Sequence, residues 1–422
     1  MKAKYLPLLL TLAVIIGFIA GMQVQEVPLI TSPDKNAFRK SSDEWQKVKT
    51  LIKRYHPLGK RADSLEYQLL NELLNELDPY SQFVPFNAPE YYAGKLNGVA
   101  SHWGVKGSVS GDTLLVIEVE SASPLYLKGV QPGDRLIMYE DRIVWLSHIQ
   151  SEKILEIPNK EVFEIESCLS AVSSDGEELY IKIKQFGPKA YREFMQILEN
   201  FPQARKQLVI DLRGNPGGDL NQALQIANQF IDQEEKDLLH MRLGNNKEKT
   251  FTSSGKNFFK PGTIRVFIDS RTASSAEILT GILQVYADAL VVGKESMGKN
   301  ELMKRFELED GVLFLQTGSY SINGLENFGN GRGVLPNVEL TLDSLGRNLF
   351  SASSKEELLE KYLTFQYNES KIPVKVREFQ WLDQCTAAER MLWFDIMSSH
   401  IQEKELFKLL KNYDPYFALS IE

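Results

Sequence analysis

The stretch QLVIDLRGNPGGDLNQALQIANQFI, residues 207–231, contains three successive elements of an α/β fold. Its first part, Gln207–Leu212, is an apolar run of strand length, and a glycine-rich turn follows at 213–218. A helix is predicted next, over Leu220–Ile231. The alternation continues on both sides, with strands predicted at 179–184, 263–268, 289–292 and 313–318 and helices at 189–200 and 275–286. Alternation of this kind predicts an α/β core.

Length and composition place the chain among ordinary globular proteins. It has 422 residues, enough for two or three domains, of which 43% are hydrophobic and 25% charged. The formal net charge of −8 argues against nucleic acid as a partner, because phosphate binding needs a basic surface. Cys168 and Cys385 are predicted to be buried thiols, with one disulfide as the alternative. The five histidines form no HxxxH pair, so we expect no metal site, and no cofactor is implied.

Residues 1–25 carry a targeting signal. Lys2 and Lys4 precede the apolar segment Leu6–Ala20, and positive residues before an apolar run direct the following chain across a membrane. The uncharged run is close to the ~20 residues that span a bilayer, and Phe18 makes a poor cleavage site. A retained signal anchor is therefore favoured over a cleaved signal peptide, and a buried core helix is the third alternative. Both targeting interpretations place the rest of the chain outside the cytoplasm, on the periplasmic side.

Sequence patterns divide the rest of the chain into segments. Residues 26–95 are predicted to be a linker followed by a helical segment, and residues 346–422 to be a helical C-terminal segment. Between them, residues 96–145 change to strand and turn patterns. An apolar strand is predicted at Thr113–Val119, and a turn at Pro132-Gly133.

Two turns of the predicted core open helices after buried strands, and a helix N-terminus presents unpaired N–H groups that can hold an oxyanion. The turn at 213–218 is a donor site of this kind, a phosphate cradle, or only a tight strand-to-helix connection; it lacks a phosphate-loop motif. In the turn 271–278, Ser274 is either an exposed nucleophile or, with Glu277, a capping box that only begins the helix. A serine nucleophile needs a base. Lys299, which follows a buried strand and a glycine turn, is either that base, with a pKa lowered by burial, or an ordinary surface lysine.

Six ordered motifs together resemble the carboxy-terminal processing (tail-specific) serine proteases over residues 65–340. The motifs are Leu77-Asp78-Pro79-Tyr80-Ser81 (LDPHS in the family), Gly129-Val130-Gln131-Pro132-Gly133-Asp134 (GLKPGD), Val209–Gly218 (LILDLRNNPGG), Thr272–Ile278 (SASASEI), Val291-Val292-Gly293 with Gly298-Lys299 (VVGE..FGKG), and Gly331–Val338 (GKGIEPDV). The resemblance implies an α/β protease core of the crotonase/ClpP-like type at 179–345. It also implies an inserted β-rich PDZ-like domain at 96–178, shortened here, and helical N- and C-terminal segments.

The same resemblance implies the catalytic residues. The family's nucleophile lies three residues before the motif glutamate, which is Ser274 here, and its base lies 25 residues later, at Lys299 (299 − 274 = 25). The implied oxyanion donors are the N–H of Ser275 and that of Gly217 or Gly218. The implied activity is that of an extracytoplasmic serine endopeptidase with a Ser/Lys dyad.

The implied partners are protein or peptide substrates captured near a free C-terminus. The loop that receives a peptide carboxylate through backbone N–H groups is implied at Trp103-Gly104-Val105. Trp103 as plain core is the alternative. Self-association through the helical ends, giving a homo-oligomer, is a further expectation.

The chain departs from the family at the third catalytic position. Some members have an aspartate eleven residues after the serine, where Val285 stands, and others have a glutamine four residues after the lysine, where Met303 stands. These departures keep a second hypothesis open, in which the chain is a catalytically weak or inactive relative that binds peptides. A membrane-tethered structural protein is the third alternative.

Overall fold

The computed structural model describes residues 47–55, 62–85, 99–100, 104–110, 113–120, 123–138, 142–147, 153–156, 163–202, 206–244, 247–255, 259–340, 358–359, 361–363 and 374–418. The chain divides into two compact units, Met1–Leu73 and Leu74–Glu422. In the first unit, residues 47–55 are helical and α3, Ala62–Leu77, begins. The signal anchor expected at residues 1–25 lies outside the described residues. Among the helices that are described, none has both the length and the apolar character needed to cross a membrane.

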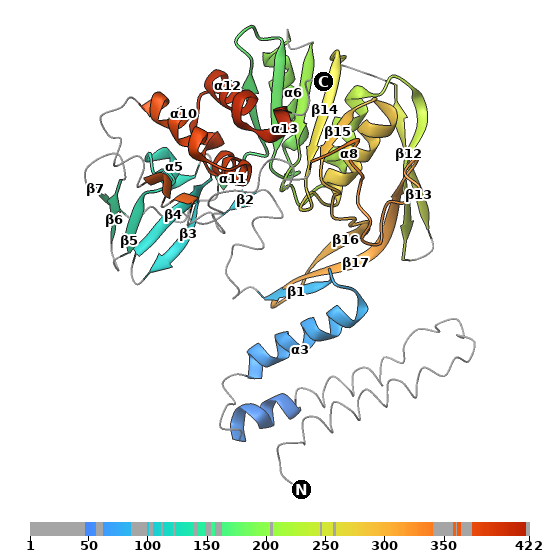
Figure 1. The fold of residues 1–422 in the computed structure, drawn as a ribbon. Helices are drawn as coiled ribbons and strands as arrows, with labels where there is room; N and C mark the ends of the chain where they lie inside the picture. Colours follow the sequence, from blue (N-terminus) through green and yellow to red (C-terminus); the bar gives the residue numbers. More distant parts are fainter. Residues whose placement is uncertain are drawn as a thin grey trace. The chain divides into compact units, whose positions relative to one another are not determined.

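A six-stranded sheet forms the centre of the second unit, in the order β18-β15-β14-β11-β10-β9 (Figure 1). Its strands are β9 (Cys168–Val172), β10 (Glu178–Ile183), β11 (Gln207–Asp211), β14 (Thr263–Ile268), β15 (Leu290–Gly293) and β18 (Val338–Glu339). Neighbouring strands from β10 to β18 are parallel, and β9 is antiparallel to β10. The α/β alternation predicted from the sequence is therefore confirmed. The sheet reaches back to Cys168, within the range 96–178 that the sequence analysis assigned to the PDZ-like domain.

Both faces of this sheet are buried, because successive side chains of a strand point to opposite faces. One face packs against α6 (Ala190–Asn200), α7 (Leu220–Ala227) and α8 (Ser275–Tyr286), the helices that connect its parallel strands. This face carries Leu179, Ile181, Ile183, Leu208, Ile210, Val266, Ile268 and Val291. The other face carries Ala171, Tyr180, Val209, Phe267 and Val292. Parallel strands that are buried on both faces consist of nearly continuous apolar residues. These strands could therefore be predicted from the sequence.

The C-terminal segment covers the second face of the sheet. Its helices are α10 (Val374–Gln384), α11 (Ala387–Met397), α12 (Glu403–Tyr413) and α13 (Pro415–Ala418), red in Figure 1. Trp393, Phe407 and Phe417 belong to the same buried cluster as Phe267 of β14. The helical C-terminus predicted from the sequence is confirmed for these residues, and it packs on its own chain. Cys168 and Cys385 are both buried free thiols, as predicted.

A second sheet contains β1 (Gln82–Pro85), β12 (Glu234–Leu243), β13 (Glu248–Ser254), β16 (Glu301–Glu307) and β17 (Gly311–Ile322). All its pairings are antiparallel. The sequence analysis predicted a strand only at 313–318 and missed β1, β12, β13 and β16. Strands β12, β13 and β16 are rich in exposed polar side chains, so no apolar run marks them, and β1 is only four residues long.

A third, smaller sheet comes before the core in sequence. Its order is β3-β4-β5-β6-β7, with β3 (Val105–Ser110), β4 (Thr113–Val119), β5 (Arg135–Met138), β6 (Arg142–Leu146) and β7 (Lys153–Glu156). The predicted strand at Thr113–Val119 is confirmed. Its own core contains Val116, Leu125, Val130, Leu136 and Trp145. The turn before β5 is held by Asp134, whose carboxylate accepts hydrogen bonds from Trp145 Nε1 (2.7 Å) and the N–H of Gln131 (2.9 Å).

Candidate functional site

Two strand-to-helix turns meet at the carboxyl ends of β11 and β14. The first, at 212–219, leads into α7, and the second, at 269–274, leads into α8. Direct hydrogen bonds join them: Thr272 Oγ1 donates to the Leu212 carbonyl (2.9 Å), the N–H of Ala273 donates to the Asn215 carbonyl (3.0 Å), and Ser275 Oγ donates to the Gly218 carbonyl (2.9 Å). The two turns that the sequence singled out are therefore in contact.

Ser274, the predicted nucleophile, has an uncommon backbone conformation, with φ 57° and ψ −121°. Few residues other than glycine adopt a positive φ, and such strain persists where the surrounding structure enforces it. Helix α8 begins at the next residue, so the serine stands at the helix N-terminus, where the helix dipole favours negative charge. This is a suitable position for a group that attacks a carbonyl carbon and generates an oxyanion.

The Glu277 carboxylate connects the serine turn to the lysine loop. Its Oε2 accepts hydrogen bonds from the N–H of Ser274 (2.7 Å) and the N–H of Lys299 (2.9 Å). Its Oε1 accepts from Ser296 Oγ (2.6 Å) and from the N–H of Gly298 (2.6 Å). Burial raises the pKa of Glu277, and the four donors oppose that shift. Sequence analysis considered Glu277 as half of a capping box. In the structure a single oxygen atom of its carboxylate binds the backbone N–H groups of both Ser274 and Lys299.

Lys299, the predicted base, is half-buried. Burial lowers the pKa of Lys299 below its ordinary value, while the carboxylates of Glu301, Asp78 and Glu277 oppose that shift. Its Nζ lies 4.6 Å from the centroid of the Tyr80 ring. A lysine whose ammonium form is disfavoured is neutral, and so able to accept a proton from a serine, at lower pH than free lysine.

Tyr320, which the sequence analysis missed, touches both members of the dyad. Its hydroxyl donates to the Lys299 carbonyl (2.6 Å) and is also hydrogen-bonded to the Ser274 side chain. Burial raises the pKa of Tyr320 well above its ordinary value, so the phenol stays protonated. No local motif marks this residue: it lies near the C-terminal end of β17 and reaches the site only through sheet pairing.

The predicted oxyanion donors differ in their hydrogen bonding. The N–H of Gly217 already donates to Asn215 Oδ1 (2.8 Å). The N–H groups of Gly218 and Ser275 donate to no acceptor in the part of the chain that the structure describes, and the Ser275 hydroxyl links the two residues. Of the two glycines that the resemblance left open, the geometry therefore favours Gly218.

A buried ionic network supports the first turn. Arg213 contacts Asp211 (2.6 Å) and Asp414 (2.7 Å), and all three side chains are at most 7% exposed. Tyr180 donates a 2.6 Å hydrogen bond to Asp211. Burial alone would raise the pKa of Asp211, but Arg213 and Lys182 hold it below its ordinary value. Asp414 belongs to the C-terminal segment and is 201 residues from Arg213 in sequence, so the sequence analysis did not connect them.

The remaining predicted residues fall in different places. Trp103 lies outside the described residues. Gly104 has φ 77°, its carbonyl accepts from the N–H of Glu120 (2.7 Å), and Val105 opens β3. Val285 lies on α8, and Met303 lies on β16 opposite Gln316. Neither brings a polar side chain to Lys299, so no third catalytic group stands at the two positions that the family uses.

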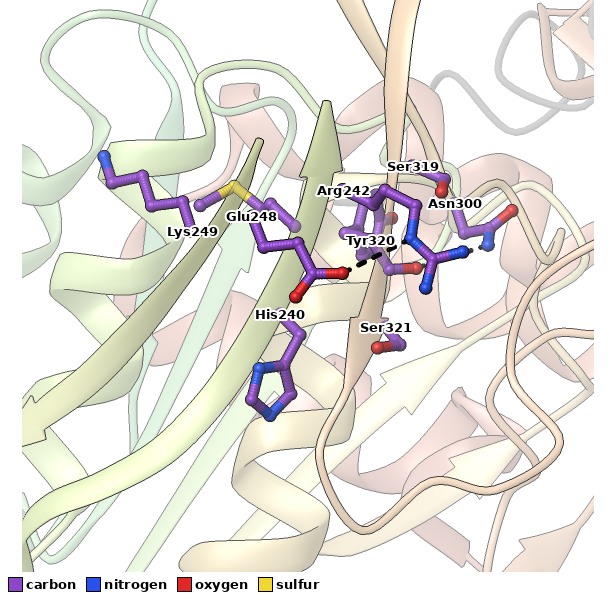
Figure 2. A pocket seen from close by; sticks show the side chains of 9 residues that line it. His240, Arg242, Glu248, Lys249, Asn300, Ser319, Tyr320 and Ser321 are labelled. Carbon is purple, nitrogen blue, oxygen red and sulfur yellow. Dashed lines mark hydrogen bonds and ion pairs between the residues drawn. The ribbon is translucent and has the colours of Figure 1, made fainter. Parts of the chain in front are cut away.

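A pocket of about 410 Å³ lies on the second sheet, lined by His240, Met241, Arg242, Glu248, Lys249, Asn300, Ser319, Tyr320 and Ser321 (Figure 2). The cross-strand pairs His240–Ser321 and Arg242–Ser319 lie on its open side, whereas the pair Met241–Tyr320 is buried. The pocket therefore opens on the face of the sheet that points away from Ser274, and we assign it no part in the chemistry. Within the described ranges, no group of three or more His, Cys, Asp or Glu side chains is arranged to hold a metal ion.

Comparison with known proteins finds similarities that include the core. The family model described as Peptidase family S41 matches residues 178–340. A probable CtpA-like serine protease of Staphylococcus aureus (strain bovine RF122 / ET3-1) is 24% identical over 302 residues, which cover 66% of this chain and 60% of that protein. The chain thus spans 60% of the length of this curated relative. A carboxyl-terminal-processing protease of Picosynechococcus sp. (strain ATCC 27264 / PCC 7002 / PR-6) is 27% identical over 324 residues, covering 69% of this chain and 76% of that one.

Among solved structures, the photosystem II D1 C-terminal processing protease is similar, with 18% identity and a TM-score of 0.43. The likeness covers 72% of this chain and 88% of that one.

Proposed function

We propose that this chain, whose residues 178–340 form a Peptidase family S41 domain, is a serine endopeptidase with Ser274 as nucleophile and Lys299 as base. The observation that carries the proposal is the Glu277 carboxylate. One of its oxygen atoms accepts the N–H groups of Ser274 and Lys299, which are 25 residues apart (299 − 274 = 25). This shared acceptor fixes the backbone of Ser274 relative to that of Lys299. Such positioning is needed if the lysine side chain takes a proton from the serine side chain.

The chemistry follows from the groups present. Neutral Lys299 Nζ takes the proton of Ser274 Oγ as that oxygen forms a bond to the scissile carbonyl carbon. The N–H groups of Ser275 and Gly218 hold the resulting oxyanion. The Lys299 ammonium then gives its proton to the departing amine nitrogen as the C–N bond breaks. A water molecule, deprotonated by the same amine, attacks the acyl-enzyme and releases the acid.

Substrate capture is proposed for the third sheet. The turn motif at 129–134, the five strands from β3 to β7 and the sequence 103–105, where the family resemblance implies a carboxylate-binding loop, support a PDZ-like role for the segment that precedes β9. Such a module would receive a free C-terminal carboxylate through backbone N–H groups, as Gly104 at φ 77° would allow. We accordingly propose protein or peptide substrates with an accessible C-terminus.

Features of residues 1–25 and of α3 support proposals for the cellular location and the self-association of the protein. We propose an extracytoplasmic, periplasmic-side enzyme held by residues 1–25, since Lys2 and Lys4 precede an apolar run there. An apolar stripe on α3, formed by Leu69, Leu73 and Leu77, is more than half exposed and supports self-association. Carbonate extraction of membranes would test the first point, and light scattering of Leu69→Glu/Leu73→Glu the second.

The alternative function is peptide binding without turnover. It is favoured by the apolar Val285 and Met303 at the two family positions of the third catalytic residue, and by the absence of a hydrogen bond between Lys299 Nζ and Ser274 Oγ among the described atoms. Retention of both dyad residues and of the Glu277 connection opposes it.

Cleavage of unfolded casein by the purified full chain tests the proposal, with Ser274→Ala and Lys299→Ala as variants. We expect each substitution to lower the rate by about 10³-fold or more, with circular dichroism unchanged. A wild type that binds casein but leaves it intact from pH 6 to 10 would support peptide binding instead.

A further inference from the structure

The base Lys299 must be oriented by a group other than those used elsewhere in the family. Val285 and Met303 are apolar and occupy the two family positions of the third catalytic residue. A Cβ atom at Gly324 would meet Val285 at 2.7 Å, so this valine packs against the loop after β17. The question is therefore which described group holds the amine.

The Lys299 backbone is immobilised at both ends. Its N–H donates to Glu277 Oε2 (2.9 Å), and its carbonyl accepts from the Tyr320 hydroxyl (2.6 Å). What remains free is the four-carbon side chain. In the described part of the chain, the group in direct contact with its Nζ is the Tyr80 ring, at 4.6 Å from the centroid.

Tyr80 itself is held by a rigid turn. The Asp78 carboxylate accepts from the N–H of Tyr80 (2.7 Å), the N–H of Ser81 (2.6 Å) and Ser81 Oγ (2.5 Å). Ser81 is 1% exposed, and its Oγ accepts from the N–H of Gln316 in β17 (3.0 Å). The following strand, β1, pairs with the same β17. The backbone that carries the Tyr80 ring is thus tied to the strand that also carries Tyr320.

We propose that Tyr80 is the positioning residue of the base, its ring face holding the Lys299 amine where other family members use a polar third group. The inference rests on the proposed function. A ring face suits both states of the amine: it attracts the ammonium that forms when Ser274 gives up its proton. It also presents no hydrogen-bond donor that would occupy the lone pair of the neutral amine.

The charged groups around the amine set the direction of the expected pH effect. Glu301 on β16, Asp78 before β1 and Glu277 on α8 favour the ammonium form, and burial disfavours it. The Tyr80 ring adds to the groups that favour the ammonium. Removing the ring is therefore expected to lower the pKa of the Lys299 amine, so that its neutral form is populated at lower pH.

The test compares Tyr80→Leu with Tyr80→Phe in the full chain. We expect Tyr80→Leu to lower kcat about tenfold, to leave KM within about twofold, and to move the acid limb of the pH–rate profile to lower pH. Tyr80→Phe keeps the ring face, so its kcat and the acid limb of its pH–rate profile should match those of the wild type. A limb that does not move in Tyr80→Leu, or a Tyr80→Phe variant as impaired as Tyr80→Leu, would overturn the proposal.

A second readout separates this inference from the proposed function. The rate of acetylation of Lys299 by acetic anhydride, followed against pH by mass spectrometry, reports the titration of its amine without any turnover. A downward shift in Tyr80→Leu but not in Tyr80→Phe supports the contact even if the wild type cleaves nothing. Identical titration curves in all three proteins would reject it.

Discussion

At Glu277 a single buried carboxylate accepts four hydrogen bonds from two separate loops. Charge-assisted hydrogen bonds of this kind are about twice as strong as neutral ones. They fix the backbone of the nucleophile relative to that of the base, while burial tunes the base. Geometry and pKa are therefore set by different groups, and each can be tested separately.

Glu277→Gln should reduce activity on the order of 10²-fold, because an amide nitrogen would then face backbone N–H donors and displace the loop. The measurement is kcat/KM on an unfolded protein substrate, together with urea denaturation. Glu193→Gln is the matched control, since Glu193 also lies in the first turn of a helix and accepts two backbone N–H groups, from Ser167 (2.8 Å) and Cys168 (3.1 Å). An equal loss of activity in both variants would contradict the special role of Glu277.

The pH dependence of activity should follow Lys299. Burial lowers the pKa of its amine below 10.5, so the neutral, proton-accepting form is populated at lower pH than in free lysine. The rate should rise with pH through this lowered pKa and then level off. A pH–kcat/KM profile measures it, and a limb no lower than the pKa of free lysine would contradict the lowered pKa of the Lys299 amine.

At the scale of elements, the site depends on two turns that approach one another more closely than side chains permit. A Cβ atom at Gly217 would lie 2.8 Å from Ser274 Cβ and 2.9 Å from the Ala273 carbonyl oxygen. Gly217 also has φ 98°, which L-residues rarely adopt. Glycine is thus required here both by the turn and by the contact between β11 and β14 loops.

Gly217→Ala should lower activity on the order of 10²-fold by pushing the serine turn away from the oxyanion donors. Gly129→Ala is the control: Gly129 has a similar φ of 91°, but its Cβ would meet only Trp145 Cη2, at 3.7 Å. Both substitutions introduce backbone strain of about 1–2 kcal/mol. Only Gly217→Ala should lower kcat. Comparable kcat values in the two would refute the steric argument.

At the scale of the whole second unit, the C-terminus completes the core. Asp414 neutralises Arg213 on the face of the sheet that the C-terminal helices cover, and Tyr416 packs against the same guanidinium, whose central carbon is 4.3 Å from the ring centroid. Removing one partner of a buried ion network leaves an uncompensated charge, which costs more than the pair contributes. The C-terminal helices therefore support the turn that carries Gly218.

Asp414→Ala should lower the free energy of unfolding by about 3 kcal/mol. Glu307→Ala breaks an exposed pair with Arg305 (2.9 Å) and should cost at most about 1 kcal/mol. Urea denaturation of both variants measures the difference. Equal midpoints would mean that Asp211 alone suffices for Arg213.

Local pattern in the sequence was sufficient for the buried parallel strands, the helices that connect them and the two turns that hold Ser274 and Gly218. Each of these depends on apolar periodicity or on glycine, which act over a few residues. The family resemblance, together with the matching 25-residue spacing of Ser274 and Lys299, supplied the candidate dyad. Tertiary structure alone decided which groups surround it.

The contacts of Lys299 with Tyr80, of Tyr320 with both dyad residues, and of Asp414 with Arg213 join segments far apart in sequence. The polar strands β12, β13 and β16 were missed for a related reason. Strand pairing within a sheet and ion pairing within a core depend on which segments come together after folding. A short stretch of sequence contains no information about such distant contacts.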